Sequence, residues 1–247
     1  MLGLPGTTEA CLFDLDGVLT KTASLHAAAW KEMFDAFLQA RAAETGEPFR
    51  PFDAVSDYDR FVDGMPRLDG VRTFLASRRI ELPSGHASDP PDVDTVAALG
   101  ARKNAIVLRM AREDGVEAYE GSVRYVGAAR DAGLRRAVVS SSANCREFLA
   151  AAGIEDLFEA VVDGNVRARE HLKGKPAPDT FLFAARQLDV VPARAAVFED
   201  ALAGAEAGRA GDFGYVVGVD RVGQAEELQA HGADDVVNDL AELLDRP

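Results

Sequence analysis

Short apolar runs that end on polar residues recur along the chain. The first covers residues 10–13 and ends on Asp14. A short and continuously apolar run is typical of a strand that is buried on both faces of a sheet. Four later runs have the same character, so we expect five strands, at residues 10–13, 136–139, 195–198, 214–219 and 235–237.

Helical patterns lie between these runs. Several of them stop at a glycine, such as Gly133, Gly153 or Gly211, and glycine is common just past the end of a helix. Short strands that alternate with helices predict a Rossmann-like α/β core, with a parallel sheet covered by helices on both faces. The expected helices span residues 122–132, 144–152, 180–188 and 202–210.

The segment 22–117 has a different pattern. Residues Trp30, Met33, Phe34, Phe37 and Leu38 recur at helical spacing, which predicts an amphipathic helix. Apolar pairs near residues 74 and 106 indicate two more helices, and the stretches 45–63 and 83–94 resemble loops. We therefore expect an all-helical domain at 22–117, inserted into a core made of 1–21 and 118–247. Two domains in series is the alternative, but a lone first strand could not then complete a sheet.

The charge balance excludes some classes of partner. The 247 residues carry 27 Lys and Arg against 41 Asp and Glu, a net charge of −14. Such a chain does not hold nucleic acid or an anionic membrane by bulk electrostatics, so an anionic ligand needs a local cation or a metal. Two cysteines, no apolar run long enough for a membrane helix and no signal-peptide pattern predict a cytoplasmic protein. We expect a monomer.

Polar residues follow three of the predicted strands. Asp14 and Asp16 come after the first, Ser140 after the second, and Glu199 with Asp200 after the third. A single aspartate at a strand end is usually a turn former or a helix cap. Two acidic pairs at one sheet edge would repel each other without a cation. They therefore predict a site for a hard cation such as Mg²⁺.

Two further residues fit an anion at this edge. Gly17 permits a sharp turn and a close approach of the backbone. Lys175 lies in the sequence Gly-Lys-Pro-Ala-Pro-Asp at 174–179, where the prolines stiffen the chain and aim the ammonium group. A solvated surface charge is the other interpretation of a single lysine.

These residues resemble the four motifs of haloacid dehalogenase-type phosphotransferases. The motifs occur in the family's order, through residues 10–212, and the helical insert lies where that family carries its cap domain. The matching residues are the run Asp14-Leu15-Asp16-Gly17-Val18-Leu19-Thr20, then Ser140, then Lys175-Pro176, and then Glu199-Asp200.

The resemblance implies roles for the core residues. Asp14 would be the nucleophile that forms an aspartyl-phosphate, and Asp16 the general acid and base. Lys175 would neutralise the charge that develops on the phosphoryl group, and Ser140 would donate a hydrogen bond to it. Two other functions are alternatives to phosphoryl transfer. One is dehalogenation, whose chemistry has no need of a metal site at Asp16, Glu199 and Asp200. The other is a non-catalytic sugar-phosphate-binding module, which would not need the complete set of catalytic residues. The implied Mg²⁺ ligands are Asp14, the carbonyl of Asp16, Asp200 and, directly or through another ligand, Glu199.

The insert and the second strand end resemble β-phosphoglucomutase-like members of the family. By that resemblance Arg67, Ser142 and Asn144 would hold the phosphate that is distant from Asp14. Each of these residues could instead have a purely structural role. Trp30 would then belong to the core of the insert, and His26 would be a hydrogen-bonded histidine at an interface. Arg67 would pair with an aspartate, and Lys103 and Asn104 would lie on a solvated helix face. The implied substrate contacts are His26, Trp30, Gly64, Arg67, Lys103, Asn104, Ser142 and Asn144.

The resemblance implies a phosphorylated sugar as substrate. The expected reaction interconverts β-D-glucose 1-phosphate and glucose 6-phosphate through glucose 1,6-bisphosphate, which is both intermediate and activator. The alternative is a Mg²⁺-dependent sugar-phosphate phosphatase. Two residues depart from the family pattern: Ala143 replaces a lysine at the distal phosphate, and Lys21 replaces an acidic residue at the hinge.

Overall fold

The chain folds into two compact units. The computed structural model describes residues 2–246. The first unit contains the chain up to Lys21, the segment Gly64–Pro66 and the chain from Val116 onward, and the second contains Thr22–Asp63 and Arg67–Gly115. Gly64–Pro66 lies within the predicted insert at 22–117 but packs with the first unit. The assignment of the units as a catalytic core and a cap stays a prediction.

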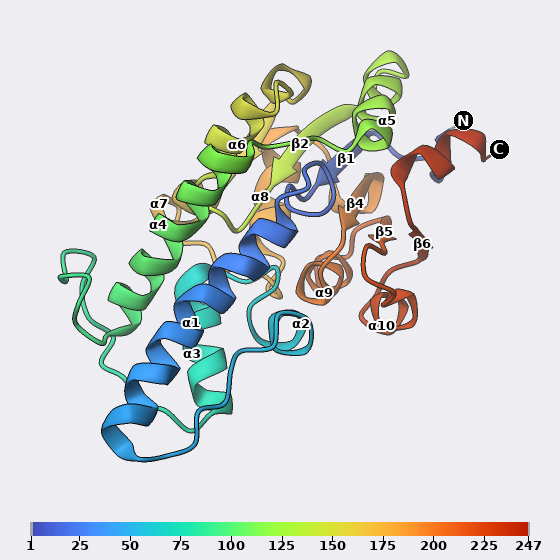
Figure 1. Ribbon diagram of the computed structural model, residues 1–247. Coiled ribbons are helices and arrows are strands. Elements are labelled where there is room, and N and C mark those ends of the chain that lie inside the picture. Colours follow the sequence, from blue (N-terminus) through green and yellow to red (C-terminus); the bar gives the residue numbers. More distant parts are fainter. Residues whose placement is uncertain (1, 247) are drawn as a thin grey trace. The chain divides into compact units, whose positions relative to one another are not determined.

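A parallel sheet of six strands forms the centre of the first unit (Figure 1). Every neighbouring pair runs parallel, and the order across the sheet is β3-β2-β1-β4-β5-β6. The expected α/β fold with a Rossmann-like parallel sheet is confirmed. The strands are β1 (Ala10–Phe13), β2 (Arg135–Val139), β3 (Ala160–Val162), β4 (Ala195–Glu199), β5 (Tyr215–Val219) and β6 (Asp235–Val237).

Helices connect these strands, as parallel pairing requires. The α-helices are α5 (Glu120–Asp131), α6 (Cys145–Ala151), α7 (Gly164–Arg169), α8 (Asp179–Gln187), α9 (Leu202–Ala210) and α10 (Ala225–Ala230). The 3₁₀ turns are η1 (Glu155–Leu157), η2 (Pro192–Arg194) and η3 (Leu240–Asp245).

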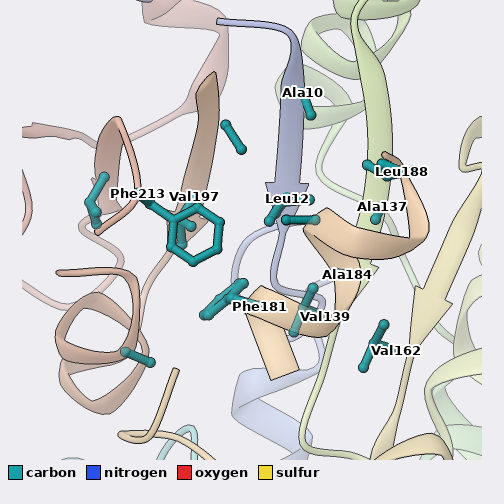
Figure 2. Packing of buried hydrophobic residues seen from close by; sticks show 14 of the residues in the cluster. Ala10, Leu12, Ala137, Val139, Val162, Phe181, Ala184, Leu188, Val197 and Phe213 are labelled. Atoms are coloured by element: carbon teal, nitrogen blue, oxygen red, sulfur yellow. The ribbon is translucent and has the colours of Figure 1, made fainter. Parts of the chain in front are cut away.

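Apolar side chains cover both faces of the sheet. Figure 2 shows Leu12, Val139 and Val197 of the strands together with Phe181 of α8 in one buried cluster. On the opposite face, Phe13 stacks on Phe198 with ring centroids 4.5 Å apart. All four residues of β1 are buried. A strand buried on both faces has no room for alternating polar positions, which explains its continuous apolar pattern.

The second unit is built from helices α1 (Ala23–Thr45), α2 (Ser56–Phe61), α3 (Arg67–Ser77) and α4 (Val96–Asp114). Its core is aromatic: Phe34 lies 5.3 Å from Trp30, 5.3 Å from Phe52 and 4.1 Å from Phe74, measured between ring centroids. The predicted amphipathic helix corresponds to α1, whose buried face carries Trp30, Met33, Phe34, Phe37 and Leu38.

Some elements differ from the sequence-based expectation. Helix α2 lies inside the stretch 45–63 that resembled a loop, and the Asp53 carboxylate accepts hydrogen bonds from the backbone N–H groups of Val55 and Ser56 at its start. Strand β3 was not expected, although β6, which also has three residues, was. Helices α7 and α10 have six residues each, too few to show a clear helical period, and were also missed. Among the described residues, no helix is long and apolar enough to cross a membrane.

We expect replacement of Phe34 by alanine to lower the free energy of unfolding by about 3–5 kcal/mol, because it removes a fully buried ring from a packed core. Phe49→Ala in the same unit is the matched control, since Phe49 is 44% exposed, and it should cost less than about 0.5 kcal/mol. Urea unfolding followed by circular dichroism measures both. Equal losses in the two variants would contradict the assigned core.

Candidate active site

Three neighbouring strands bring the predicted polar residues to one sheet edge. Phe13 of β1 is in register with Val138 of β2 and with Phe198 of β4. The backbone N–H of Asp14 then donates to the carbonyl of Phe198 at 2.9 Å, so the sheet hydrogen bonding continues into the site. Parallel strands in this register place the residues that follow them side by side.

Three carboxylates meet at this edge. One oxygen from each of Asp14, Glu199 and Asp200 lies within 4.8 Å of the other two. Asp14 is 6% exposed, Glu199 0% and Asp200 7%. The expectation that the two strand ends converge is therefore confirmed for these three residues. Asp16 is less buried, and its backbone forms a bridge with Thr20 within the same loop.

Lys175 reaches the acidic cluster from the loop before α8. Its ammonium group donates to Asp14 Oδ1 at 2.5 Å, to the carbonyl of Val139 at 3.0 Å and to Glu199 Oε1. The side chain is 1% exposed, and Nζ lies 4.9 Å from the ring centroid of Phe181. The alternative of a solvated surface lysine is excluded by this burial.

The buried charges shift one another's pKa values. Burial raises the pKa of Asp14 to about 6 and that of Glu199 to about 8, although Lys175 acts in the opposite direction. Burial would by itself lower the pKa of Lys175, but the two carboxylates together raise it above its ordinary value. Both carboxyls therefore ionise less readily than they would in water.

The donor set fits a divalent cation. If all three carboxyls are ionised, they and the ammonium group sum to a charge of −2 in a space that is nearly inaccessible to water. Oxygen ligands of this kind suit a hard divalent cation such as Mg²⁺. Gly17 contributes to the fit, because a Cβ atom at this position would overlap the carboxylate of Asp200 and because its φ is +84°. Only glycine combines that conformation with that contact.

The loop after β2 supplies hydroxyl groups. Ser140 Oγ accepts from the backbone N–H of Ser142 at 3.1 Å, and Ser142 Oγ accepts from that of Asn144 at 3.2 Å. Each serine thereby keeps its own O–H for donation to another acceptor. Ser141 Oγ donates to the carbonyl of Gly64 at 2.7 Å, so Gly64 lies against this loop.

Five of the predicted substrate contacts lie together within the helical unit. His26 Nδ1 is 2.8 Å from Lys103 Nζ, and Arg67 Nη1 donates to Asn104 Oδ1. The ammonium group of Lys103 also lies 5.1 Å from the ring centroid of Trp30. Trp30 itself is 3% exposed, so the interpretation of Trp30 as core of the insert matches its packing.

Burial lowers the pKa of His26 well below its ordinary value, and the positive charges of Lys103 and Arg67 lower it further. His26 is therefore neutral near pH 7. Because Lys103 can only donate, Nδ1 is the acceptor, and we assign the ring proton to Nε2. The alternative interpretation paired Arg67 with an aspartate; in the structure Arg67 donates to Asn104, and Asp69 accepts from Arg72 at 2.9 Å.

Some features of the site were not predicted. A Cβ atom at Gly204, in the first turn of α9, would overlap the carboxylate of Glu199, so this glycine makes room for that side chain. Lys21 forms an ion pair with Glu117 at 2.7 Å, with both side chains exposed. In the stretch 45–63 that resembled a loop, the Asp57 side chain is 16% exposed and pairs with Arg78 at 2.7 Å.

Comparison with known proteins identifies the family. A protein-family model described as haloacid dehalogenase-like hydrolase matches residues 8–212. The chain belongs to this family. Within it, the chain is a β-phosphoglucomutase-like member: it is 57% identical over 247 residues to a β-phosphoglucomutase of Mycobacterium tuberculosis, covering 99% of this chain and 94% of that protein.

More distant relatives also include proteins that are named β-phosphoglucomutase. A β-phosphoglucomutase of Bacillus subtilis is 32% identical, covering 95% of this chain and 91% of that protein. The crystal structure of a β-phosphoglucomutase from Clostridium difficile superposes with a TM-score of 0.73 at 25% identity, covering 96% of this chain and 93% of that chain. These members of the haloacid dehalogenase-like family match both units of this chain, because the coverage extends over nearly its whole length.

We expect the metal-free protein to lose stability as pH rises from about 6.5 to 8. Free glutamic acid in the unfolded chain is already ionised in this window, whereas folded Glu199 keeps its proton up to a pKa of about 8. The folded state therefore binds more protons, and each such group contributes a fall of up to about 1.4 kcal/mol per pH unit. His26 acts in the opposite direction at the lower end of this window, because the unfolded imidazole still binds part of a proton near its ordinary pKa while folded His26 is neutral, and this effect fades as pH rises.

Urea unfolding in EDTA at a series of pH values measures this dependence. Glu199→Gln should show a shallower fall, and added Mg²⁺ should flatten the wild-type curve because it stabilises the ionised carboxylates. A wild-type stability that rises over this window would show that the cluster is not protonated as described.

Proposed function

We propose that the chain is a β-phosphoglucomutase that interconverts β-D-glucose 1-phosphate and glucose 6-phosphate through glucose 1,6-bisphosphate. The observation that carries the proposal is 57% identity, over nearly the full length, to a protein of that name. The buried group of Asp14, Lys175, Glu199 and Asp200 supplies the chemistry that such a reaction needs.

In the proposed mechanism, an oxygen of Asp14 attacks a phosphorus atom of the bisphosphate. The bond from phosphorus to the sugar oxygen breaks, and Asp16 gives that oxygen a proton. Phosphorylated Asp14 then transfers the group to the free 6-hydroxyl of an incoming β-D-glucose 1-phosphate, and Asp16 takes the hydroxyl proton. This step forms a new bisphosphate, and attack by Asp14 on its 1-phosphate releases glucose 6-phosphate and restores phosphorylated Asp14. Lys175 neutralises part of the charge on the phosphoryl oxygens, and Ser140 donates a hydrogen bond to one of them.

We further propose that the acidic cluster holds Mg²⁺. Asp14, Asp200 and the backbone carbonyl of Asp16 would be ligands, with Glu199 bound directly or behind them. Bound Mg²⁺ supplies electrostatic screening between the phosphate and the attacking carboxylate. Because two anions must approach each other in this reaction, the negative charge that the cluster carries when its carboxyls are ionised favours such a cation at the place where phosphate binds.

The helical unit is proposed to recognise the sugar and its second phosphate. Arg67 provides a guanidinium group for that phosphate, and Ser142 with Asn144 provides polar groups for it from the α/β unit. Lys103 and Asn104 are proposed to contact sugar hydroxyls, and neutral His26 can exchange hydrogen bonds with the substrate. Ala143, between Ser142 and Asn144, brings no cation, which leaves Arg67 as the proposed charged group for the second phosphate.

A Mg²⁺-dependent sugar-phosphate phosphatase is the second candidate, because the matching family model is described as a hydrolase. The two activities share the attack by Asp14 and differ in what accepts the phosphoryl group. In a phosphatase the acceptor is water, and in a mutase it is a sugar hydroxyl, so a mutase must exclude water while Asp14 is phosphorylated.

We expect Asp14→Asn to reduce turnover by at least about 1,000-fold, because it removes the nucleophile. Asp16→Asn should reduce turnover by about 100- to 10,000-fold, because proton transfer is lost. Asp131→Asn is the control on the same unit, since its side chain is 74% exposed. A coupled assay for glucose 6-phosphate, with trace glucose 1,6-bisphosphate, measures all three. Retained turnover in Asp14→Asn would refute the assigned nucleophile.

The same assay separates the two candidate functions. A mutase should form glucose 6-phosphate from the β anomer of glucose 1-phosphate, be stimulated by bisphosphate and release little inorganic phosphate. A phosphatase should release phosphate rapidly with no stimulation by bisphosphate. The second result would overturn the proposed mutase function and would retain the role of Asp14.

For Arg67→Ala we expect KM for the sugar phosphate to rise about 10- to 100-fold, because a charged hydrogen bond to phosphate is lost. Arg72→Ala on the same helix is the matched control: its guanidinium group pairs with Asp69 on the exposed surface. Steady-state kinetics of both variants test the assignment. An unchanged KM in Arg67→Ala would remove Arg67 from the phosphate site.

A further inference from the structure

The loop that follows β5 is held rigidly by one carboxylate. Asp220 Oδ1 accepts hydrogen bonds from the backbone N–H groups of Val222 at 3.1 Å, Gly223 at 2.6 Å and Gln224 at 2.9 Å. Burial would raise the pKa of Asp220, but these backbone donors outweigh it and lower that pKa. The backbone conformation of loop 220–224 is thus fixed by hydrogen bonds to Asp220.

Arg221 extends from this loop to the loop of the first motif. Its Nε donates to the carbonyl of Gly17 at 2.8 Å, and its Nη1 donates to the carbonyl of Asn238 at 2.5 Å. The guanidinium carbon lies 3.6 Å from the ring centroid of Tyr119. Only 16% of the Arg221 side chain is exposed, so the guanidinium group is clamped between a ring and two carbonyls.

Gln224 extends from loop 220–224 to the loop after β4. Its side-chain amide donates to the backbone carbonyl of Asp200 at 3.0 Å. Strand β5 is the neighbour of β4, and β4 is the neighbour of β1. Through Arg221 and Gln224, loop 220–224 therefore contacts both loops that carry acidic residues of the site. Two side chains of one loop therefore hold the backbones of two catalytic segments.

The two held segments contact each other at the acidic cluster. Gly17 packs so closely on the Asp200 carboxylate that a Cβ atom there would overlap it. The distance between the first motif and Asp200 therefore depends on where these two backbones lie. A shift of either carbonyl would move Asp200 relative to Asp14.

We propose that Arg221 and Gln224 are positioning residues that set the geometry of the cation site. This proposal rests on the proposed function only in taking the cluster of Asp14, Glu199 and Asp200 as a Mg²⁺ site. Neither side chain bonds a carboxylate of the cluster in the structure; each acts through a backbone carbonyl. Residues that orient metal ligands in this way commonly change metal affinity by about 10- to 100-fold when they are replaced.

Isothermal titration calorimetry of the metal-free protein with Mg²⁺ tests the proposal. We expect Arg221→Ala and Gln224→Ala each to raise the Kd for Mg²⁺ by about 10-fold or more. Arg221→Lys should give an intermediate Kd, because an ammonium group can bond a carbonyl but lacks the planar fork that stacks on Tyr119. Urea unfolding in EDTA shows how far each variant is destabilised independently of the metal.

Matched controls are available in the same unit. Arg209→Ala removes a guanidinium group that bonds the carbonyl of Gly232 and the carboxylate of Asp234, and Gln229→Ala removes an exposed amide from α10. Both should keep the wild-type Kd for Mg²⁺. If Arg221→Ala does not fold, Gln224→Ala and Arg221→Lys still test the proposal.

The outcomes separate this proposal from the proposed function. Wild-type Mg²⁺ affinity in both Arg221→Ala and Gln224→Ala would overturn the positioning role, whatever the activity or the stability of the variants. A wild-type chain that binds Mg²⁺ but does not interconvert the glucose phosphates would refute the mutase function and leave the positioning role standing. A wild-type chain that binds no Mg²⁺ would overturn both.

Discussion

The burial of three carboxylates around one ammonium group is the constraint on which the active site depends. Asp14, Glu199 and Asp200 cannot all ionise beside Lys175 without leaving uncompensated negative charge, and uncompensated buried charge is expensive. The site therefore favours protonation, a divalent cation or both. A cation that compensates the carboxylates also lets an anionic phosphate approach an anionic nucleophile, so the same electrostatic imbalance links stability, metal binding and chemistry.

The sheet makes this concentration of charge possible. Its central strands are packed on both faces by aromatic and aliphatic side chains, with Phe13 against Phe198 on one face and Leu12 in the cluster that contains Phe181 on the other. These apolar contacts stabilise the fold and so offset the cost of burying the charged groups at the strand ends. Fixed strand ends also hold the nucleophile and its partners in one geometry, which reduces the reorganisation that phosphoryl transfer would otherwise require.

Most of the α/β fold was predictable, because the spacing of apolar residues and the glycines and prolines that end helices and strands are local properties of the sequence. The strands of four or more residues each contain a run of at least three apolar residues, and several of the helices between them end next to a glycine. Some short elements were missed: β3 has three residues, and α2 has six and follows a turn in which the Asp53 side chain accepts from the backbone N–H groups of Val55 and Ser56. Among the site residues, the strand-end carboxylates and Lys175 were identified because strand ends and prolines mark the chain. Gly204, Arg221 and Gln224 carry no such mark.

The sequence by itself determined which chemical groups exist and on which strand ends they lie, since hydrophobic periodicity and motif order are written along the chain. Only the tertiary structure decided that Lys175 is buried between Asp14 and Glu199, that Trp30 packs in an aromatic core, and that His26 is paired with Lys103. The physical reason is that pKa values, burial and hydrogen-bond partners depend on contacts between residues far apart in the chain. Such contacts exist only once the chain has folded.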